Sequence, residues 1–375
     1  MKVGQIAPIW YGIPPKKYGG TERIVSLLTD GLVNNGIKTT LFATGDSITK
    51  AKLQSIINKG LVELGYGFSN VGYPLYHFVS ALHAQNDFDI IHLHFTTKFD
   101  YTTLSLALPF INKTVVTFHT PFPINEELQD RKKLLEEKLN NFNYISISDD
   151  QRKNMKLNFV NTVYNGLKLS DFHFSPYSGD KMLWLSRIAP IKGTLEAIQI
   201  AQTSNKKIII CGIIGEYDKA KHASYFKSVE KFRKSKFAIF VGEKYAKDKI
   251  NLFQRAKVFI FPLQWEEPFG LVLIEAMACG TPVIAYARGA IPEIIKDGET
   301  GFIINPSEKD KRGNFIVKKT GQAGFVEAIN KIYNMSPEEY EVMRCASRAH
   351  VENSFTDEAM VKEYIKVYQK VLARN

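Results

Sequence analysis

The sequence has little cysteine and no long hydrophobic run, and these absences exclude several classes of protein. Its three cysteines, Cys211, Cys279 and Cys345, lie far apart, which fits neither a disulfide framework nor a zinc site. No apolar run reaches the roughly 18 residues that a membrane-spanning helix requires. Prolines and glycines interrupt the first twenty residues, which makes them a poor signal peptide. We therefore expect a protein of the reducing cytoplasm that has no metal centre.

Signatures of nucleic-acid binding are also missing. The chain has no zinc-finger spacing, no aromatic RNA-binding motif and no basic helix with heptads. Its net charge of +11 is spread out, because residues 1–170 carry +4 and the remainder carries +7. Such a surface can attract a phosphorylated substrate, an anionic membrane or nucleic acid, but a solvated lysine-rich surface is the simpler interpretation. We expect no nucleic-acid partner.

Strand-like and helix-like segments alternate nearly from end to end. In the first half, the runs KVGQIAPI, KTTLFAT, DIIHLHF, TVVTFHT and YISIS are apolar on both faces, as buried parallel strands are. In the second half, KMLWLS, KKIIICGI, FAIFVG, VFIFPL, PVIAY and GFIIN repeat the pattern. Helices are expected between them, among them ERIVSLLTDGLVNN, closed by Gly36, and EELQDRKKLLEEKLNN. The alternation predicts an α/β protein with two Rossmann-like, doubly wound parallel-sheet domains.

The boundary between these domains is expected in the segment 165–181, which is rich in Ser, Asp, Gly and Pro. We expect domains at 1–170 and 171–355, followed by a final helical segment at 356–375. In open parallel sheets, ligands bind beyond the carboxyl ends of the strands, close to helix N-termini. Two such domains facing across a cleft would present two walls suited to anions.

The motif YGGTER, residues 18–23, lies between the first strand and the first helix. Gly19 and Gly20 let the backbone approach a ligand closely, and amides at a helix N-terminus favour phosphate. No GxGxxG pattern and no Walker lysine is present, so binding of a dinucleotide or a P-loop nucleotide has weak support. A plain turn with Thr21 as the helix cap explains the same residues equally well.

The motif SRIAPIKG, residues 186–193, follows the first strand of the second half. Arg187 and Lys192 would reach a diphosphate there, Arg as a fork and Lys as a point charge. Basic loop residues are often simply solvated, but the position at the carboxyl end of a strand favours a functional role.

Three histidines lie near the ends of strands in the first half. We expect the alternation in HLHF to point His92 and His94 to opposite faces, against joint metal ligation, and assign both a structural role. His119 ends its strand just before a turn that contains proline, where it can bond a sugar hydroxyl or a backbone carbonyl.

Two carboxylates flank the start of an otherwise apolar helix in EEPFGLVLIEAMACG. Pro268 keeps Glu267 out of the helix, and Glu275 lies about one turn inside it. A buried carboxylate needs a partner. Either Glu275 pairs with an internal Lys or Arg, or a ligand supplies the partner. In the second case Glu267 would accept hydrogen bonds from hydroxyls at one end of a long polar ligand. Glu275 would accept them from a diol at the other end.

These motifs together resemble the retaining nucleotide-sugar glycosyltransferases of family four, which have the two-domain GT-B fold. YGGTER, HLHF, TFHT, YNGLKL, WLSRIAPIKG and the two-carboxylate block EEPFGLVLIEAMACGTPVIA fall in the family's order over nearly the whole chain. The N-terminal segment is also similar to a bacterial subgroup related to antibiotic-sugar glycosyltransferases. Three positions depart from the family pattern, namely Lys168 after NG, Ser186 before Arg187, and Ala290 in ARGA.

The resemblance implies a role for each candidate residue. Glu275 is expected to hold the ribose of the nucleotide, and Glu267 the hydroxyls of the donor sugar. Arg187 and Lys192 are expected to neutralise the donor diphosphate, with His119 facing the sugar. Backbone contacts to the donor are expected from Gly19, Gly20, Phe269, Gly270 and Leu271. The last helix is expected to cross back onto the first domain.

The implied reaction transfers a hexosyl group from a nucleoside diphosphate sugar, a UDP-sugar being favoured, with retained anomeric configuration and attack on the same face. We expect no metal and no cofactor, since no Asp-x-Asp motif suited to Mg²⁺ or Mn²⁺ is seen beside the expected diphosphate site and the basic pair would stabilise the leaving diphosphate. The alternatives are a sugar phosphorylase, a nucleotide-sugar epimerase and a non-catalytic carbohydrate-binding protein.

The acceptor is open at this point. A sugar, a lipid-linked sugar, a polysaccharide, a small metabolite and a protein are all candidates. The basic segment 50–64 is a candidate for peripheral contact with the inner face of the membrane, although we expect it to form a surface helix.

Overall fold

The computed structural model describes residues 1–17, 19–97, 100–122, 129–215 and 222–374. The chain divides into two compact units. The first unit comprises Met1–Lys168 together with Thr356–Asn375, and the second comprises Leu169–Phe355. Each unit is built around its own parallel sheet, which confirms the predicted fold class of two Rossmann-like domains.

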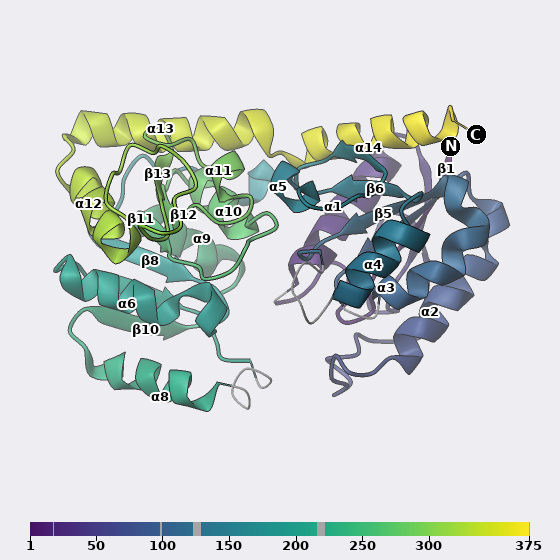
Figure 1. Cartoon of the computed structure of the whole chain (residues 1–375), viewed down its shortest axis with the longest axis horizontal. Helices are drawn as coiled ribbons and strands as arrows, with labels where there is room; N and C mark the ends of the chain where they lie inside the picture. Colours follow the sequence, from purple (N-terminus) through teal and green to yellow (C-terminus); the bar gives the residue numbers. More distant parts are fainter. Residues whose placement is uncertain (18, 98–99, 123–128, 216–221, 375) are drawn as a thin grey trace. The chain divides into compact units, whose positions relative to one another are not determined.

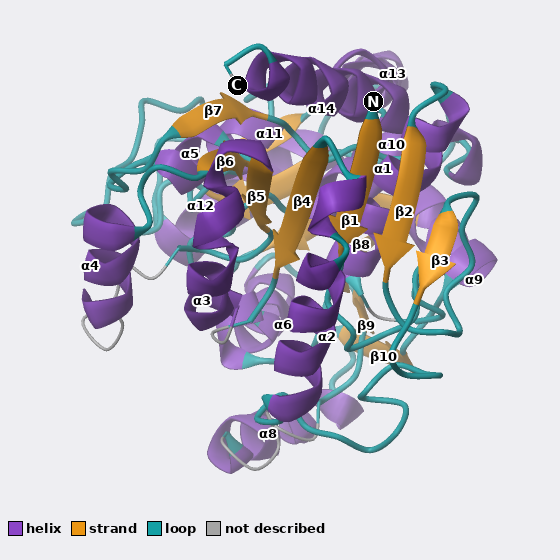
Figure 2. Ribbon diagram, turned by 90° about the vertical axis from the view of Figure 1, so that its right-hand side faces the viewer, coloured by secondary structure: helices purple, strands orange, loops and turns teal. Residues whose placement is uncertain are grey.

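The sheet of the first unit has the strand order β3-β2-β1-β4-β5-β6-β7, with every pair parallel (Figure 2). Its strands are β1 (Lys2–Ile6), β2 (Lys38–Phe42), β3 (Lys52–Gln54), β4 (Ile90–Phe95), β5 (Thr114–Phe118), β6 (Asn143–Ser146) and β7 (Phe159–Thr162). All six residues of β4 are buried, because the sheet is covered on both faces. The order reverses between β1 and β4, so the carboxyl ends of these two strands form a topological switch point.

The helices of the first unit include one from the end of the chain. They are α1 (Gly20–Asn34), α2 (Gly72–His83), η1 (Gln85–Asp87), α3 (Asp100–Thr103), η2 (Leu104–Lys113), α4 (Gln129–Lys138), α5 (Asp149–Arg152) and α14 (Asp357–Leu372). Figure 1 shows α14, in yellow, beside α1. Gly31 of α1 lies so close to Val361 that an added Cβ would meet that side chain at 2.4 Å. The last helix is therefore an integral part of the first unit.

Two predicted helices of this unit differ from the structure. The helix predicted from the run EELQDRKKLLEEKLNN, residues 126–141, is observed as α4 (Gln129–Lys138). The first three residues of that prediction, 126–128, lie outside the described residues. The surface helix expected at 50–64 was wrong, since this segment forms β3 and turns. Its Leu61 is buried against Ile9 and Trp10, so the apolar residues of the segment complete a small core.

The sheet of the second unit has the order β10-β9-β8-β11-β12-β13, again all parallel. Its strands are β8 (Lys181–Leu185), β9 (Ile208–Cys211), β10 (Ala238–Gly242), β11 (Ala256–Phe261), β12 (Val283–Tyr286) and β13 (Gly301–Ile304), and all six coincide with predicted runs. The switch point lies between β8 and β11. The motifs at 186–193 and 264–275 therefore begin at neighbouring strand ends.

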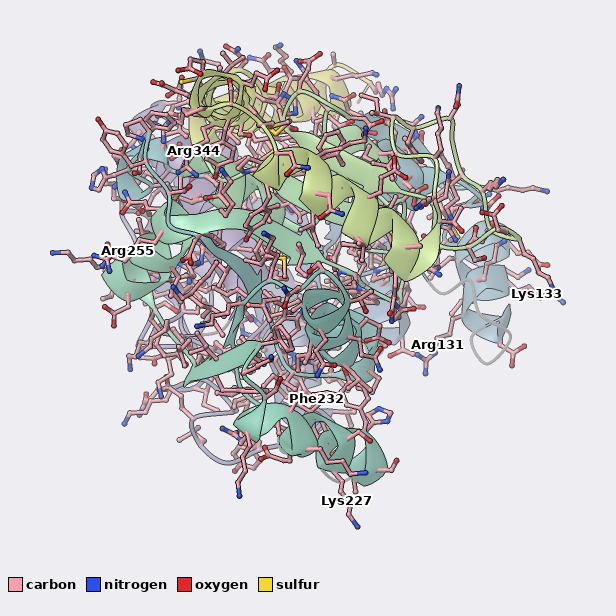
Figure 3. All side chains as sticks on the ribbon, turned by 90° about the vertical axis from the view of Figure 1, so that its left-hand side faces the viewer. Arg131, Lys133, Lys227, Phe232, Arg255 and Arg344 are labelled. Carbon is pink, nitrogen blue, oxygen red and sulfur yellow. The ribbon has the colours of Figure 1, made fainter. Side chains whose placement is uncertain are left out.

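Helices flank this second sheet. They are η4 (Leu169–Asp171), η5 (Pro190–Lys192), α6 (Thr194–Thr203), α8 (Ala223–Glu230), η6 (Lys231–Lys234), α9 (Ala246–Arg255), α10 (Leu271–Ala278), α11 (Ile291–Ile294), α12 (Gly321–Tyr333) and α13 (Pro337–Ser354). The edge strand β10 contacts η6, which in turn contacts α8. Figure 3 labels Phe232 of η6 and Lys227 of α8. Among the described residues, no helix is both long and apolar enough to cross a bilayer.

A buried arginine fixes α13 to the end of α10. Arg344 (Figure 3) is fully buried and donates to the carbonyls of Ser175 at 2.7 Å and Cys279 at 3.3 Å. Cys279 is the C-cap of α10, whose unpaired carbonyls favour a cation. The position of α10, which carries Glu275, is thus set from its carboxyl end.

The turn that carries Lys192 requires glycine at its end. Gly193 has φ 69°, and an added Cβ would lie 1.9 Å from the carbonyl oxygen of Pro262. We expect Gly193→Ala to lower the free energy of unfolding by about 3 kcal/mol or more, because strain and a backbone clash combine. Urea unfolding followed by tryptophan fluorescence measures this change.

Gly242 of the same unit is the matched control. Its φ is 71° but nothing lies within 4 Å of an added Cβ, so Gly242→Ala should cost only about 1–2 kcal/mol. Equal losses in the two variants would show that the contact with Pro262 is not tight.

Candidate functional site

Basic and acidic residues meet at the switch point of the second unit. Arg187 lies two residues after β8, and Lys192 ends η5 directly before α6. Glu267 lies in the loop that follows β11. The backbone links the two loops, since Gln264 donates its amide to the carbonyl of Ile191 at 2.8 Å. The fold therefore brings residues 75 positions apart into one site.

Lys192 and Glu267 form a short, largely buried ion pair. Lys192 Nζ lies 2.7 Å from Glu267 Oε2, and the side chains are only 14% and 11% exposed. The indole Nε1 of Trp265 donates to the same oxygen at 2.9 Å. The ammonium also lies 4.3 Å from the centre of the Trp265 ring, which favours a cation through the ring's quadrupole. The aromatic ring and the carboxylate together hold Lys192 in place.

The helix α10 begins beside this pair. Gly270 is its N-cap with φ 93°, and no side chain caps the helix. The amide of Leu273 donates to the carbonyl of Gly270 at 2.9 Å, and the amide of Leu271 lies at the end of the helix that favours negative charge. Phe269 is buried and packs edge-on against Phe355, which fixes the turn before the helix.

Glu275 has an internal partner. Lys249 of α9 places its Nζ 2.7 Å from Glu275 Oε1, with the two side chains 17% and 8% exposed. Of the two interpretations left open by the sequence, the structure shows the ion pair with an internal lysine. Lys249 is four residues before the buried Phe253 on the same helix, so both project from the face that packs against α10.

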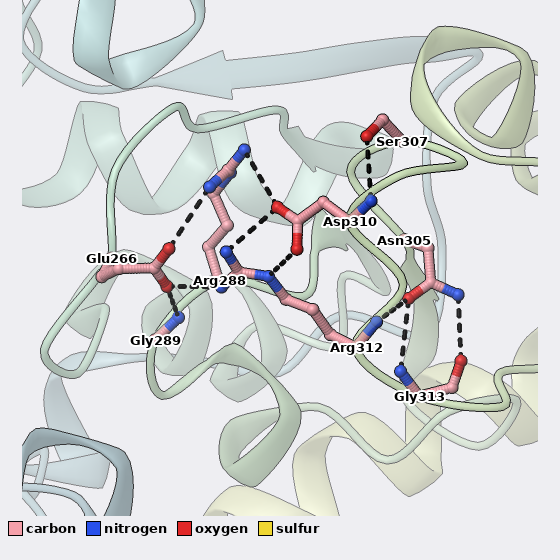
Figure 4. A network of polar contacts seen from close by, with 8 residues as sticks. All are labelled: Glu266, Arg288, Gly289, Asn305, Ser307, Asp310, Arg312 and Gly313. Atoms are coloured by element: carbon pink, nitrogen blue, oxygen red, sulfur yellow. Dashed lines mark hydrogen bonds and ion pairs between the residues drawn. The ribbon is translucent and has the colours of Figure 1, made fainter. Parts of the chain in front are cut away.

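A second set of charges secures the loop that carries Glu267 (Figure 4). Its neighbour Glu266 accepts from Arg312 at 2.7 Å and from the amide of Gly289 at 2.6 Å. Arg288 lies 3.3 Å from Glu266 and 3.7 Å from Asp310. Burial disfavours the ionised form of Glu266, but the hydrogen bond and charge of Arg312 outweigh it and hold its pKa below the usual value.

In the first unit, the glycine pair lies at the start of α1. Gly19 is the N-cap with φ 148°, and no side chain caps this helix, so Thr21 is not the cap. An added Cβ on Gly19 would lie 2.9 Å from Glu22 Oε2. Glu22 is buried, and this burial raises its pKa to about 7. The loop is thus packed closely enough to require glycine.

His119 belongs to a buried chain of hydrogen bonds in this unit. His119 Nε2 lies 3.0 Å from His94 Nδ1, and His94 Nε2 lies 2.5 Å from Gln5 Oε1. Gln5 Nε2 donates to the Tyr368 hydroxyl at 2.9 Å, and this hydroxyl lies 2.7 Å from His92 Nδ1. The chain therefore connects the end of β5 to α14.

The expected orientation of HLHF was wrong. His92 and His94 are two residues apart on one strand, so they share a face, and their ring centres are 4.0 Å apart. Burial lowers the pKa of both rings well below the usual value. Both are thus neutral near pH 7.

The chain of bonds sets the tautomer of His119. Burial lowers its pKa to about 3, so the ring is neutral and carries one N–H. Because the oxygen of Gln5 can only accept, His94 donates from Nε2 and accepts at Nδ1. His119 must then donate from Nε2, which leaves the lone pair on its Nδ1.

Comparisons with known proteins identify the family. The model "Glycosyltransferase Family 4" matches residues 18–170, and "Glycosyl transferases group 1" matches residues 172–350. The chain belongs to the family-four glycosyltransferases. This confirms the resemblance seen in the sequence and the enzyme class, hexosyltransferase, that it implied.

Relatives of this glycosyltransferase differ in their sequence identity to it and in the length over which they match it. Spore coat protein SA of Bacillus subtilis is 33% identical over 33% of the chain, a match that spans 29% of that protein. O-antigen chain mannosyltransferase C of Escherichia coli is 24% identical over 99% of both chains. The Anabaena protein HepE, solved with UDP and glucose, shares the fold with a TM-score of 0.70 and 16% identity over 98% of this chain and 99% of its own.

Two departures from the family pattern are structurally harmless. Ala290 has φ −72° and ψ −5°, an ordinary right-handed conformation that does not require a glycine. Lys168 is exposed, whereas Gly166 beside it is the position that needs glycine, since an added Cβ would lie 2.2 Å from the Thr356 carbonyl oxygen.

Tyr368→Phe tests whether the chain of bonds sets the tautomer. The variant removes the group to which Gln5 donates, so its amide can turn and His119 should become a mixture of Nδ1–H and Nε2–H forms. Long-range ¹H–¹⁵N correlation spectra of the full-length glycosyltransferase distinguish these forms.

Tyr144→Phe is the control. Tyr144 is equally buried in the same unit, but its hydroxyl donates to the carbonyl of Leu139 at 2.8 Å, outside this chain of hydrogen bonds. Both variants should lose about 1 kcal/mol of stability. A single Nε2–H signal for His119 in Tyr368→Phe would refute the link to α14.

Proposed function

We propose that this glycosyltransferase moves a hexosyl group from a nucleoside diphosphate sugar to a hydroxyl of an acceptor, with retained anomeric configuration and without a metal ion. The main support is the Lys192–Glu267 pair beside the uncapped start of α10, at the switch point of the second unit. A UDP-sugar is favoured as the donor, in line with the UDP and glucose bound to HepE.

Arg187 and Lys192 are proposed to bind the diphosphate. An ammonium has three N–H groups, so Lys192 can keep its bond to Glu267 and still donate to a phosphate oxygen. As the bond to the sugar breaks, negative charge grows on the diphosphate. Arg187, Lys192 and the amides of Phe269, Gly270 and Leu271 would stabilise this charge.

The two carboxylates are proposed to bind the ends of the donor. Glu267 would accept from hydroxyls of the sugar, and Glu275 from the ribose diol. The bond from Lys249 reaches only Oε1 of Glu275, and a carboxylate accepts at about four positions. The ion pair therefore orients Glu275 without using up its capacity.

The first unit is proposed to bind the acceptor and to contribute to the donor. Gly19 and Gly20 would approach a phosphate of the donor through the backbone. His119 would accept a hydrogen bond from a sugar hydroxyl at Nδ1, the nitrogen that carries its lone pair. The leaving phosphate oxygen would take the proton of the acceptor hydroxyl during attack on the same face.

The protein is proposed to act in the cytoplasm. Its cysteines are free thiols, and Cys211 and Cys279 are buried, which suits a reducing compartment.

Incubation with radiolabelled UDP-glucose and GDP-mannose tests the function. We expect one donor to be consumed, the rate to be the same with and without EDTA, and the product to keep the anomeric configuration of the donor. Dependence on inorganic phosphate would indicate a phosphorylase, and epimerised donor an epimerase. No turnover of any nucleotide sugar would leave a carbohydrate-binding protein.

The diphosphate assignment predicts the effect of Arg187→Ala. We expect kcat to fall by roughly 100- to 1,000-fold, the scale found when one donor that stabilises developing charge is removed. Arg255→Ala is the control, because Arg255 (Figure 3) is exposed at the end of α9. Wild-type kinetics in Arg187→Ala would refute the assignment.

A further inference from the structure

A cavity of about 220 Å³ lies at the switch point of the first unit, beside the ends of β1 and β4. We propose that this cavity binds the hydrophobic part of the acceptor, which would be an uncharged aryl or alkyl group that carries the sugar or hydroxyl to be glycosylated. The proposal rests on the transferase function above and names its acceptor class.

The lining of the cavity is mainly apolar. Trp10, Leu75, Phe78 and Phe95 contribute to its walls, and no lysine or arginine lines it among the residues that the structure describes. The carboxylate of Asp100 in the lining would repel a phosphorylated group, whereas an apolar ring would fit, since a cavity of about 150 Å³ accommodates benzene. Switch points of open parallel sheets are where ligands bind.

The rim of the cavity is an unusual surface. Segment 64–76, LGYGFSNVGYPLY, contains no charged residue and holds seven exposed large hydrophobic side chains. They are Leu64, Tyr66, Phe68, Val71, Tyr73, Leu75 and Tyr76. Val71 and Leu75 also line the cavity, so apolar surface continues from the cavity to the outside. A hydrophobic group longer than a single ring could extend along this segment.

Polar groups also line the cavity. Asp100 lines it and accepts from the amides of Thr96 and Thr97, both at 2.6 Å. His94 also lines it and bonds His119, the residue proposed to contact the donor sugar. A hydroxylated head group held at His94 would therefore lie close to His119, with its hydrophobic body against Leu75 and Trp10.

Acceptor kinetics of the full-length protein test the proposal. The acceptor probes are methyl, phenyl and octyl β-glucosides and glucose 6-phosphate. The donor is the nucleotide sugar that the protein hydrolyses when no acceptor is present. We expect KM for the phenyl and octyl glucosides to be at least tenfold lower than for the methyl glucoside. Leu75→Asp should raise the KM for the octyl glucoside at least tenfold, because it places a charge at the rim.

Leu108→Asp is the matched control and should keep wild-type acceptor kinetics. Leu108 is 41% exposed in the same unit, compared with 43% for Leu75, and does not line the cavity. Equal KM values for the methyl and octyl glucosides, or an unchanged KM in Leu75→Asp, would overturn the proposal. Binding to phosphatidylglycerol vesicles that is lost in Leu75→Asp, with unchanged KM, would instead assign the rim to a membrane.

Donor hydrolysis separates this proposal from the transferase function. If the wild-type protein consumes no nucleotide sugar, the proposed function fails. If it consumes the donor but does not distinguish hydrophobic from methyl glycosides, only the acceptor assignment fails.

Discussion

A buried carboxylate must have a partner, and this constraint organises the second unit. Glu267 is held by Lys192 and Trp265, and Glu275 by Lys249. Removing either lysine would leave an uncompensated buried charge, a loss of about 3–5 kcal/mol in comparable pairs. The pairs therefore hold the two acids in position and orient them for a polar ligand. The turn at Gly193, the buried Arg344 and the network around Glu266 all fix the backbone that carries these pairs.

Much of the fold could be predicted because parallel strands buried on both faces are apolar throughout. All six strands of the second sheet coincide with such runs. In the first sheet, β3 and β7 were missed. They are the edge strands, and KLQ and FVNT are only partly buried, so neither needs a long apolar run. The prediction of a helix at 50–64 was wrong because the spaced apolar residues of this segment pack against Trp10 from an irregular backbone.

The site was predictable only where local sequence carries the signal. An acid inside an apolar helix identifies Glu275, but nothing near it indicates Lys249, which is 26 positions away. The histidine chain depends on Gln5 and Tyr368, 363 positions apart, and no local pattern links them. The two carboxylates and the basic pair could be named from motifs, whereas their internal partners required the structure.

The return of α14 to the first unit affects the order in which the chain can fold. Gly166 packs against Thr356, and Gln5 bonds Tyr368, so the earliest strand is completed by residues near the very end. During synthesis on the ribosome, the second unit, a continuous segment, emerges whole before the first can close. The first unit is thus the later of the two to reach its native state, and until then its His92 and Gln5 lack the hydroxyl of Tyr368 that satisfies them.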